Sequence, residues 1–477
     1  MTKKTSCKVY LIDFVCYKPP SFQKCPKELT VIQVRQTGVS EELLDFMKRV
    51  LERSGLGDST YLAEIYFKQG PKGYNPSMKD SRREVELAIF GSVDMLLAKT
   101  GVKKEDIGIL IVNCCIYNTQ PSLSSIIVNR YKFKENIITY NLAGMGCSAG
   151  LLAIGLAKQL LQKKGTKTII KPCIVFYNNV HMWALALYIC LAFNGAYVVL
   201  SSLDDGELPQ KVHKNSYALI VSTESITENC YTGKHRSKFL INCLFRVGGA
   251  AILLSNRSSD RRTSKYELQH TVHTNTSSSD LSYNCILREE DNAGIVGVTI
   301  NKDLLKAAVA TIRPNVATVG HLILPIREKL IYVINYIARK IIPKVNLQPY
   351  IPDYSKAVDH FLPHVGGRPV LDELQKTLGF SDDDMEASRM TLYRYGNTSS
   401  SSIWYELAYV EAKGRVKKGD RVWQIAFGSG FKCQSVICRA MKSIDHDDSN
   451  PWTDEIHGFP VNLGDMEPFP VFFESSK

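Results

Sequence analysis

Short apolar runs alternate along the first half of the chain with stretches of helical periodicity. Runs typical of buried strands occupy residues 106–114 (DIGILIVNC), 136–141 and 216–223 (SYALIVST). Helical patterns occupy residues 40–55, 75–100 and 121–131. Ser40 is placed to cap the first of these helices, since Glu41 and Glu42 follow it. The alternation predicts α/β layering.

The pattern divides the chain near its middle. An apolar strand is expected after Gly248 and Gly249, within residues 242–255. A polar, basic connector follows at 258–265 (SSDRRTSK), and residues 265–274 then alternate like a strand that opens a second half. We therefore predict two halves, residues 1–255 and 256–477.

One apolar stretch of the second half carries interspersed charges. Residues 323–342 hold Arg327, Lys329, Arg339 and Lys340 among apolar side chains. These charges oppose a membrane span and favour a helix that lies on the protein or at a membrane interface.

Composition narrows the possible partners. The formal charge is +12, from 59 basic and 47 acidic residues among 477, which suits a membrane surface, nucleic acid or a phosphate-bearing ligand. Nucleic acid is disfavoured because the basic residues form no long block. Thirteen cysteines without a CxxC pair argue against a disulfide scaffold or a zinc site. The N-terminus lacks the apolar segment of a secretory signal.

The strongest chemical signal is the segment Asn141–Gly150 (NLAGMGCSAG). Gly144 and Gly146 allow a sharp turn that presents Cys147 at the start of a helix over residues 148–162. This helix is rich in small residues on several sides, so we expect it to be buried. Unpaired backbone N–H groups and the helix dipole should favour the thiolate of Cys147. The alternative is an inert, buried cysteine.

Two further segments supply polar groups in defined turns. In HFLPHVGGRPVLDEL, beginning at His360, a proline and two glycines place His364 in a tight loop ahead of a helix. In YRYGNTSSSSIW, beginning at Tyr393, Gly396 allows a turn at Asn397, and the serines begin another helix. Each residue alone is more often structural, but the set of Cys147, His364 and Asn397 is harder to dismiss.

These segments resemble the plant 3-ketoacyl-CoA synthases, condensing enzymes of the thiolase-like superfamily. The resemblance implies a five-layered αβαβα fold of two similar halves and catalysis by Cys147, His364 and Asn397. Cys147 would take an acyl group from acyl-CoA, and malonyl-CoA would lose CO2 to give an enolate that attacks it. His364 and Asn397 would donate hydrogen bonds to the enolate oxygen. The resemblance requires no metal and no cofactor.

The same resemblance suggests secondary site residues. His270 and His360 stand where similar family members carry histidine, with supporting or structural roles. A loop of Gly428, Ser429 and Gly430 resembles the family's glycine-rich loop beside the nucleophile. Two positions depart from the family: Tyr393 stands in place of a usual histidine, and Pro369 in place of a small residue.

The family also implies partners and a location. These are acyl-CoA and malonyl-CoA, a second copy in a homodimer, other fatty acid elongase subunits, and the endoplasmic reticulum membrane. In the family, two membrane-spanning helices precede a segment similar to residues 9–20, a β-rich run ended by two prolines. Here that segment begins near residue 9, so these helices are missing from the sequence.

Residues 163–210 interrupt the resemblance. They contain an apolar run, Met182–Leu200, of membrane-spanning length. A single span would separate the helix before it from the strand after it, although both must pack in one core. A membrane-surface hairpin, a surface insertion and a translated intron remain, and we favour the intron because the family pattern would rejoin cleanly from Gln162 to Val212.

Two other functions are alternatives to this one. A hydrolase nucleophile elbow needs glycine two residues before and after the nucleophile, but Met145 and Ala149 occupy those positions. The stronger rival is a catalytically degenerate homologue that binds acyl-CoA or a partner without turnover. The presence of Cys147, His364 and Asn397 favours the enzyme, an acyltransferase.

Overall fold

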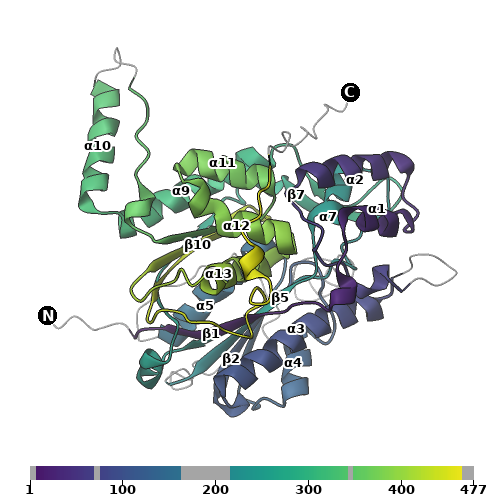
Figure 1. Ribbon diagram of the computed structural model, residues 1–477, viewed down its shortest axis with the longest axis horizontal. Coiled ribbons are helices and arrows are strands. Elements are labelled where there is room, and N and C mark those ends of the chain that lie inside the picture. Colours follow the sequence, from purple (N-terminus) through teal and green to yellow (C-terminus); the bar gives the residue numbers. More distant parts are fainter. Residues whose placement is uncertain (1–6, 69–75, 163–214, 342–346, 465–477) are drawn as a thin grey trace, which may run out of the picture.

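The computed structural model of the protein describes residues 7–68, 76–162, 215–341 and 347–464 (Figure 1). The segment 163–210 that the sequence analysis singled out lies outside the described residues.

One nine-stranded sheet runs through the molecule in the order β3-β2-β4-β5-β1-β6-β11-β10-β9. Its strands are β1 Tyr10–Cys16, β2 Ile107–Asn113, β3 Ile138–Leu142, β4 Tyr217–Thr223, β5 Gly249–Ser255, β6 Tyr266–Asn275, β9 His360–Pro363, β10 Arg421–Gly428 and β11 Lys432–Ala440. A separate hairpin pairs β7, Ile286–Glu290, with β8, Val296–Ile300. The predicted strands at 106–114, 136–141, 216–223 and 265–274 are confirmed.

The pairing pattern repeats between the two parts of the sheet. In the first part β1 is antiparallel to β5, β5 is antiparallel to β4, and β4 is parallel to β2. In the second part β6 is antiparallel to β11, β11 is antiparallel to β10, and β10 is parallel to β9. A short β1–β6 pairing, Tyr10 with Glu267 and Leu11 with Tyr266, joins the parts. This repeat supports a division of the chain at 256–265, which stays a prediction.

Helices form layers around the two parts of the sheet. Helices α5, Ala149–Gln162, and α13, Ser402–Ala412, lie between the parts, where α5 contacts strands of both. Helices α3, Met78–Thr100, and α4, Leu123–Tyr131, cover the outer face of the first part, and α9, Leu304–Ile323, covers β6 and β11 (Figure 1). The order is therefore helix, strand, helix, strand, helix, as expected.

The remaining helices surround this framework. They are α1 Lys27–Arg35, α2 Glu41–Arg53, α7 Arg236–Leu244, α8 Asp280–Tyr283, α10 Ile326–Ile341, α11 Arg368–Leu378 and α12 Asp382–Tyr395. The predicted cap is confirmed, since the Ser40 side chain accepts a hydrogen bond from the backbone N–H of Leu43. The burial of α5 is also confirmed: nine of its fourteen residues are buried, including the small residues Ala149, Gly150 and Ala153.

The helix expected over residues 323–342 is partly wrong. The chain leaves α9 at Ile323, and α10 begins only at Ile326, because Pro325 cannot continue a helix from the preceding turn. Helix α10 also projects from the body instead of lying on it (Figure 1). In the described residues no helix combines the length and apolar character needed to cross a membrane.

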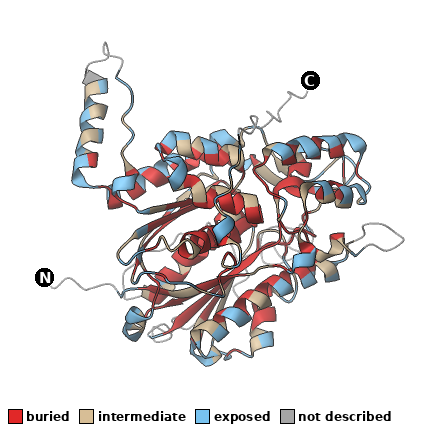
Figure 2. Cartoon of the chain, viewed as in Figure 1, coloured by how far each residue is buried: buried red, intermediate tan, exposed pale blue. Residues whose placement is uncertain are grey.

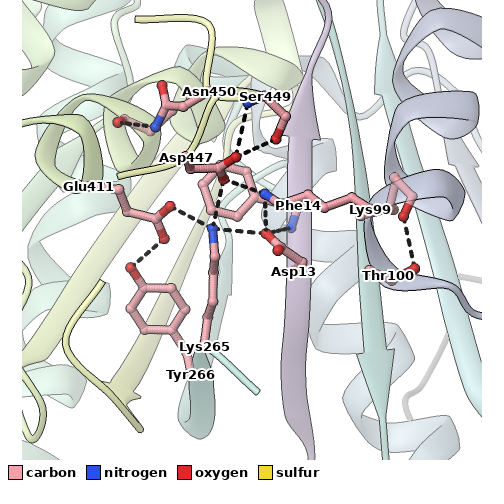
Figure 3. Close-up of polar contacts among 12 residues, drawn as sticks. Asp13, Phe14, Lys99, Thr100, Lys265, Tyr266, Glu411, Asp447, Ser449 and Asn450 are labelled. Atoms are coloured by element: carbon pink, nitrogen blue, oxygen red, sulfur yellow. Dashed lines mark hydrogen bonds and ion pairs between the residues drawn. The ribbon is translucent and has the colours of Figure 1, made fainter. Parts of the chain in front are cut away.

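A buried ionic cluster ties the two parts of the sheet together (Figure 3). The Lys265 ammonium contacts Asp13 at 2.9 Å, Glu411 at 2.8 Å and Asp447 at 3.6 Å. Lys99 of α3 contacts Asp13 at 3.0 Å and also pairs with Asp447. Burial alone would lower the pKa of Lys265, but Glu411 and Asp13 outweigh burial and hold that pKa above its usual value. The cluster thus joins β1, α3 and α13 to the start of β6 and the segment after β11.

Replacing Lys265 with methionine tests this cluster. Lys265→Met leaves the buried Glu411 without its cation and Asp13 with Lys99 alone, so we expect the free energy of unfolding to fall by about 3–5 kcal/mol in chemical denaturation. Lys8→Met is the control, because Lys8 is 54% exposed and its Glu267 pair should contribute less than about 1 kcal/mol. Equal effects of the two substitutions would contradict a role for the cluster in stability.

Candidate active site

Cys147, His364 and Asn397 line one cavity of about 110 Å³. They come from three loops far apart in the sequence: the turn before α5, the segment between β9 and α11, and the turn between α12 and α13. Most of the wall is apolar, with Ile241, Phe245, Val298, Leu304, Val370 and Phe427 among its side chains. The structure therefore brings together the three residues that the sequence grouped.

The nucleophile turn is held by contact with the glycine-rich loop. Gly146 has a φ of +61°, and a Cβ atom built on it would lie 2.5 Å from the backbone nitrogen of Ser429. A Cβ atom on Gly428 would likewise lie 2.5 Å from the nitrogen of Cys147. Only glycine fits on both sides of this contact. Gly428 and Ser429 line the cavity, whereas Gly430 does not contribute to its wall.

The thiol of Cys147 differs from the sequence-based expectation. Burial raises its pKa to about 12, although the Ser399 hydroxyl, 3.7 Å from the sulfur, and the backbone N–H of Cys147 act in the opposite direction. The nearby Glu224 carboxylate raises it further. The prediction that the helix start would favour the thiolate is therefore wrong in the free protein, because desolvation outweighs the helix terminus.

His364 is held rigidly by its backbone while its ring has no polar partner. The backbone N–H of His364 donates to the carbonyl of Ile425 at 2.9 Å, and the backbone carbonyl of His364 accepts from the N–H of Gly366 at 2.8 Å. The side chain is buried, and its ring packs at 5.7 Å from the Phe427 ring. Among the described residues neither ring nitrogen finds a hydrogen-bond partner. Burial lowers the pKa of His364 to about 3, so the imidazole is neutral at physiological pH.

Asn397 is oriented by two hydrogen bonds. Its side-chain oxygen accepts from the backbone N–H of Ser399 at 2.8 Å, and its Nδ2 donates to the carbonyl of Gly366 at 3.3 Å. These bonds fix which end of the amide faces the cavity. An amide nitrogen carries two hydrogens, and the described contacts use one, so one N–H remains for a ligand.

Glu224 and Cys115 are cavity residues that the sequence analysis missed. The buried Glu224 carboxylate accepts hydrogen bonds from the N–H groups of Cys115, at 3.0 Å, and Ile116, at 3.2 Å. Cys115 in turn supports the nucleophile turn: its sulfur accepts from Gly146 N–H at 3.2 Å, and its carbonyl accepts from Gly144 N–H at 3.1 Å. Glu224 thus positions Cys147 through a neighbouring strand end. The only sequence signal was an acidic residue directly after an apolar strand.

The other expected site residues lie outside the cavity wall. His270 is on β6, where burial lowers its pKa. His360 begins β9, and its Nε2 lies 3.0 Å from the Asp420 carboxylate. Tyr393 packs its ring against Phe459, and Pro369 lies in the first turn of α11. Direct contact of these side chains with a ligand in the cavity is therefore not expected. In the described residues no group of histidine, cysteine and carboxylate side chains is arranged to hold a metal ion.

Solved structures share the fold of this chain. The fold matches the 1,3,6,8-tetrahydroxynaphthalene synthase of Streptomyces coelicolor, a type III polyketide synthase, with a TM-score of 0.60 and 18% identity, over 91% of this chain and 99% of that one. A fungal type III polyketide synthase, ORAS, matches with a TM-score of 0.60 and 15% identity, over 91% and 99% of the two chains. The protein thus has a thiolase-like α/β fold, as predicted.

Sequence comparisons define the family more closely. The profile described as FAE1/Type III polyketide synthase-like protein matches residues 1–181 and 198–341, and the one described as 3-oxoacyl-[acyl-carrier-protein] synthase III C terminal matches residues 354–440. Arabidopsis thaliana 3-ketoacyl-CoA synthase 11 is 48% identical over 95% of this chain and 79% of its own length. Arabidopsis thaliana 3-ketoacyl-CoA synthase 2 is 46% identical over 98% and 80%. The chain belongs to the 3-ketoacyl-CoA synthase family.

The first of these family profiles matches only part of the unusual internal segment. Residues 182–197 are left unmatched between its two stretches, and they lie within the segment 163–210. The origin of that segment stays a prediction.

Substitution of Glu224 tests its support of the nucleophile turn. Glu224→Gln loses one acceptor oxygen, so a buried N–H of Cys115 or Ile116 is left unpaired, and we expect a loss of about 1–3 kcal/mol in the free energy of unfolding. Removal of the negative charge should also shift alkylation of Cys147 to lower pH, as followed by mass spectrometry. Glu228→Gln, which removes only a surface carboxylate paired with Arg288, should change neither quantity. Unchanged alkylation in Glu224→Gln would contradict the electrostatic effect.

The depressed pKa of His364 predicts an acid-sensitive stability. The unfolded chain protonates this histidine below pH 6.5, whereas the folded protein keeps it neutral to about pH 3, so unfolding is favoured as the pH falls between these values. Between pH 7.5 and pH 5.0 this one group should cost about 2 kcal/mol. His364→Gln should lack that loss, and His446→Gln, at an exposed histidine, should retain it. The measurement is urea denaturation at the two pH values. A loss of equal size in His364→Gln would contradict the assignment.

Proposed function

We propose that the protein condenses malonyl-CoA with a long-chain acyl-CoA to give a 3-ketoacyl-CoA two carbons longer, the first step of very-long-chain fatty acid elongation. The observation that carries the proposal is the meeting of Cys147, His364 and Asn397 in one apolar cavity. The relatives at 46–48% identity are named 3-ketoacyl-CoA synthases, which supports the same activity.

Acyl transfer to Cys147 comes first. Because burial keeps the thiol protonated, the attack needs a base, and the neutral imidazole of His364 has an acceptor nitrogen for the proton. The sulfur then attacks the thioester carbonyl, the bond from that carbon to the CoA sulfur breaks, and the proton passes to the departing CoA. His364 returns to its neutral form, and the acyl group remains as a thioester of Cys147.

Condensation follows with malonyl-CoA in the emptied CoA position. Loss of CO2 leaves an enolate, and its oxygen carries the developing negative charge. The ring N–H of His364 and the second N–H of the Asn397 amide can both donate to this oxygen, since neither has a hydrogen-bond partner among the described residues. The enolate carbon attacks the Cys147 thioester carbonyl, the C–S bond breaks, and the thiolate leaves with a proton taken from solvent.

The neutrality of His364 suits this second step. A protonated imidazole would place a full positive charge beside the thiol and quench by proton transfer the carbanion that must react. A neutral ring donates a hydrogen bond and supplies no labile extra proton. The apolar wall around the three residues also excludes water that would hydrolyse the acyl-enzyme.

The location and partners belong to the same proposal. We place the protein at the endoplasmic reticulum membrane, as a homodimer working with other fatty acid elongase subunits. The support is the family membership and the net charge of +12, which favours an anionic surface.

An elongation assay tests the activity. With labelled malonyl-CoA and long-chain acyl-CoAs, Cys147→Ala should abolish product, and Asn397→Ala should lower kcat by about 10²–10³-fold, the usual effect of removing one oxyanion donor. Cys7→Ala, at an exposed cysteine, should keep full activity. The chain lacking residues 163–210 should be assayed beside the full chain, because activity only in the shortened form would mark that segment as foreign to the enzyme.

One result would replace the proposal with its rival. If both forms are folded and inactive across acyl lengths, and Cys147 resists alkylation at every pH, the protein is a homologue that binds acyl-CoA or a partner without turnover.

A further inference from the structure

Helix α10 carries an exposed apolar stripe on the side that faces away from the protein. Five aliphatic side chains form it, spaced at i, i+4, i+7, i+8 and i+11: Ile326, Leu330, Val333, Ile334 and Ile337. Their exposed fractions run from 47% to 78%. At 100° per residue these positions fall within one sector of about 100°. The stripe is a continuous surface rather than scattered apolar residues.

The opposite side of α10 is the one that packs. The Asn335 side chain donates to the carbonyl of Gln348 at 3.2 Å and accepts from the N–H of Tyr350 at 3.0 Å. Glu328 accepts from Tyr350 and is paired with Lys356 at 2.8 Å. These contacts bind the returning chain, residues 347–356, to the face of α10 opposite the stripe. The helix and the returning chain form a projecting arm whose outer side is uncovered (Figures 1 and 2).

The charges on α10 are distributed unevenly. Glu328 is its only acidic residue, and it is 1% exposed on the packed face. At 100° per residue the exposed Arg327 borders the stripe, whereas Arg339 and the half-exposed rings of Tyr332 and Tyr336 lie toward the polar side of the helix. Apolar, aromatic and basic groups without a negative charge match the depth profile of an anionic lipid surface.

We propose that the α10 arm docks on an anionic lipid bilayer, with its aliphatic stripe in the acyl region and Arg327, at the border of the stripe, at the lipid phosphates. This gives a site in the fold to the membrane location proposed above, and it rests on that part of the proposal. The helix lies in the interface and does not cross the bilayer.

A second copy of the chain fits this surface less well. Antiparallel pairing of two α10 stripes would enclose the Arg327 side chain of each copy at the border of the contact, with no exposed carboxylate on either helix to neutralise it. A lipid surface supplies the missing negative charge.

The arm is also linked to the cavity. Leu304 and Ala308 of α9 line the cavity wall, and α9 continues through Pro325 directly into α10. Docking of the arm therefore fixes the position of the cavity relative to the bilayer, in which long acyl chains reside.

Vesicle flotation of the full chain tests the arm. Ile334→Glu places a charge in the centre of the stripe and should lower partition onto vesicles of phosphatidylcholine with phosphatidylserine at least about tenfold. Met78→Glu is the matched control, because Met78 is 72% exposed on α3 and its replacement should leave partition unchanged. Arg327→Gln should weaken binding by about fivefold on the anionic vesicles and little on pure phosphatidylcholine.

Three outcomes would overturn the arm as a lipid site. In the first, Ile334→Glu binds vesicles as strongly as the unsubstituted chain. In the second, Met78→Glu loses as much vesicle binding as Ile334→Glu. In the third, Ile334→Glu sediments as a monomer where the unsubstituted chain is a dimer, while its lipid binding is unchanged, which would assign the stripe to self-association. Elongation of a long-chain acyl-CoA kept in solution by detergent, without vesicles, separates the two proposals. Ile334→Glu should keep that activity. Absence of the activity in the unsubstituted chain would contradict the catalytic proposal alone.

Discussion

The active site depends on the close approach of three backbone segments. The turn at Gly146 lies against Ser429, Gly428 lies against Cys147, and Gly150 lies against the carbonyl of Ser400 so closely that a methyl group would collide there. No side chain can enter these contacts, so the nucleophile keeps one position relative to the loops of β10 and α13. Helix α5 then lies between the two parts of the sheet as a consequence, because its first turn is fixed at that junction.

Burial in this packed site determines the pKa values of the two titratable catalytic candidates. The same desolvation raises the pKa of the Cys147 thiol and lowers that of the His364 imidazole, so both are neutral in the free protein. A site of this kind stores no ion pair that a substrate must first break. A buried ionic cluster lies elsewhere, around Lys265, where three carboxylates compensate two ammonium groups.

The sequence predicted what is encoded locally. The cap at Ser40, the turn at Gly396 and the strands around the nucleophile depend on neighbouring residues, and the resemblance supplied the Cys147, His364 and Asn397 set. Contacts between distant segments were not predictable: Glu224 binds N–H groups more than a hundred residues earlier in the chain. The thiolate expectation was wrong because a helix terminus is visible in sequence, whereas burial is not. The break between α9 and α10 is indicated by Pro325 in the sequence, but the predicted helix did not take this proline into account.

The position of β1 has a consequence for synthesis of the protein on the ribosome. Residues 10–16 emerge well before their partners, since β1 pairs with β5 at residues 250–255 and with β6 at residues 266–267. At about 5–20 residues per second, this segment waits roughly ten seconds or more for its partners. An apolar strand must therefore remain unpaired, and protected from other chains, throughout that interval.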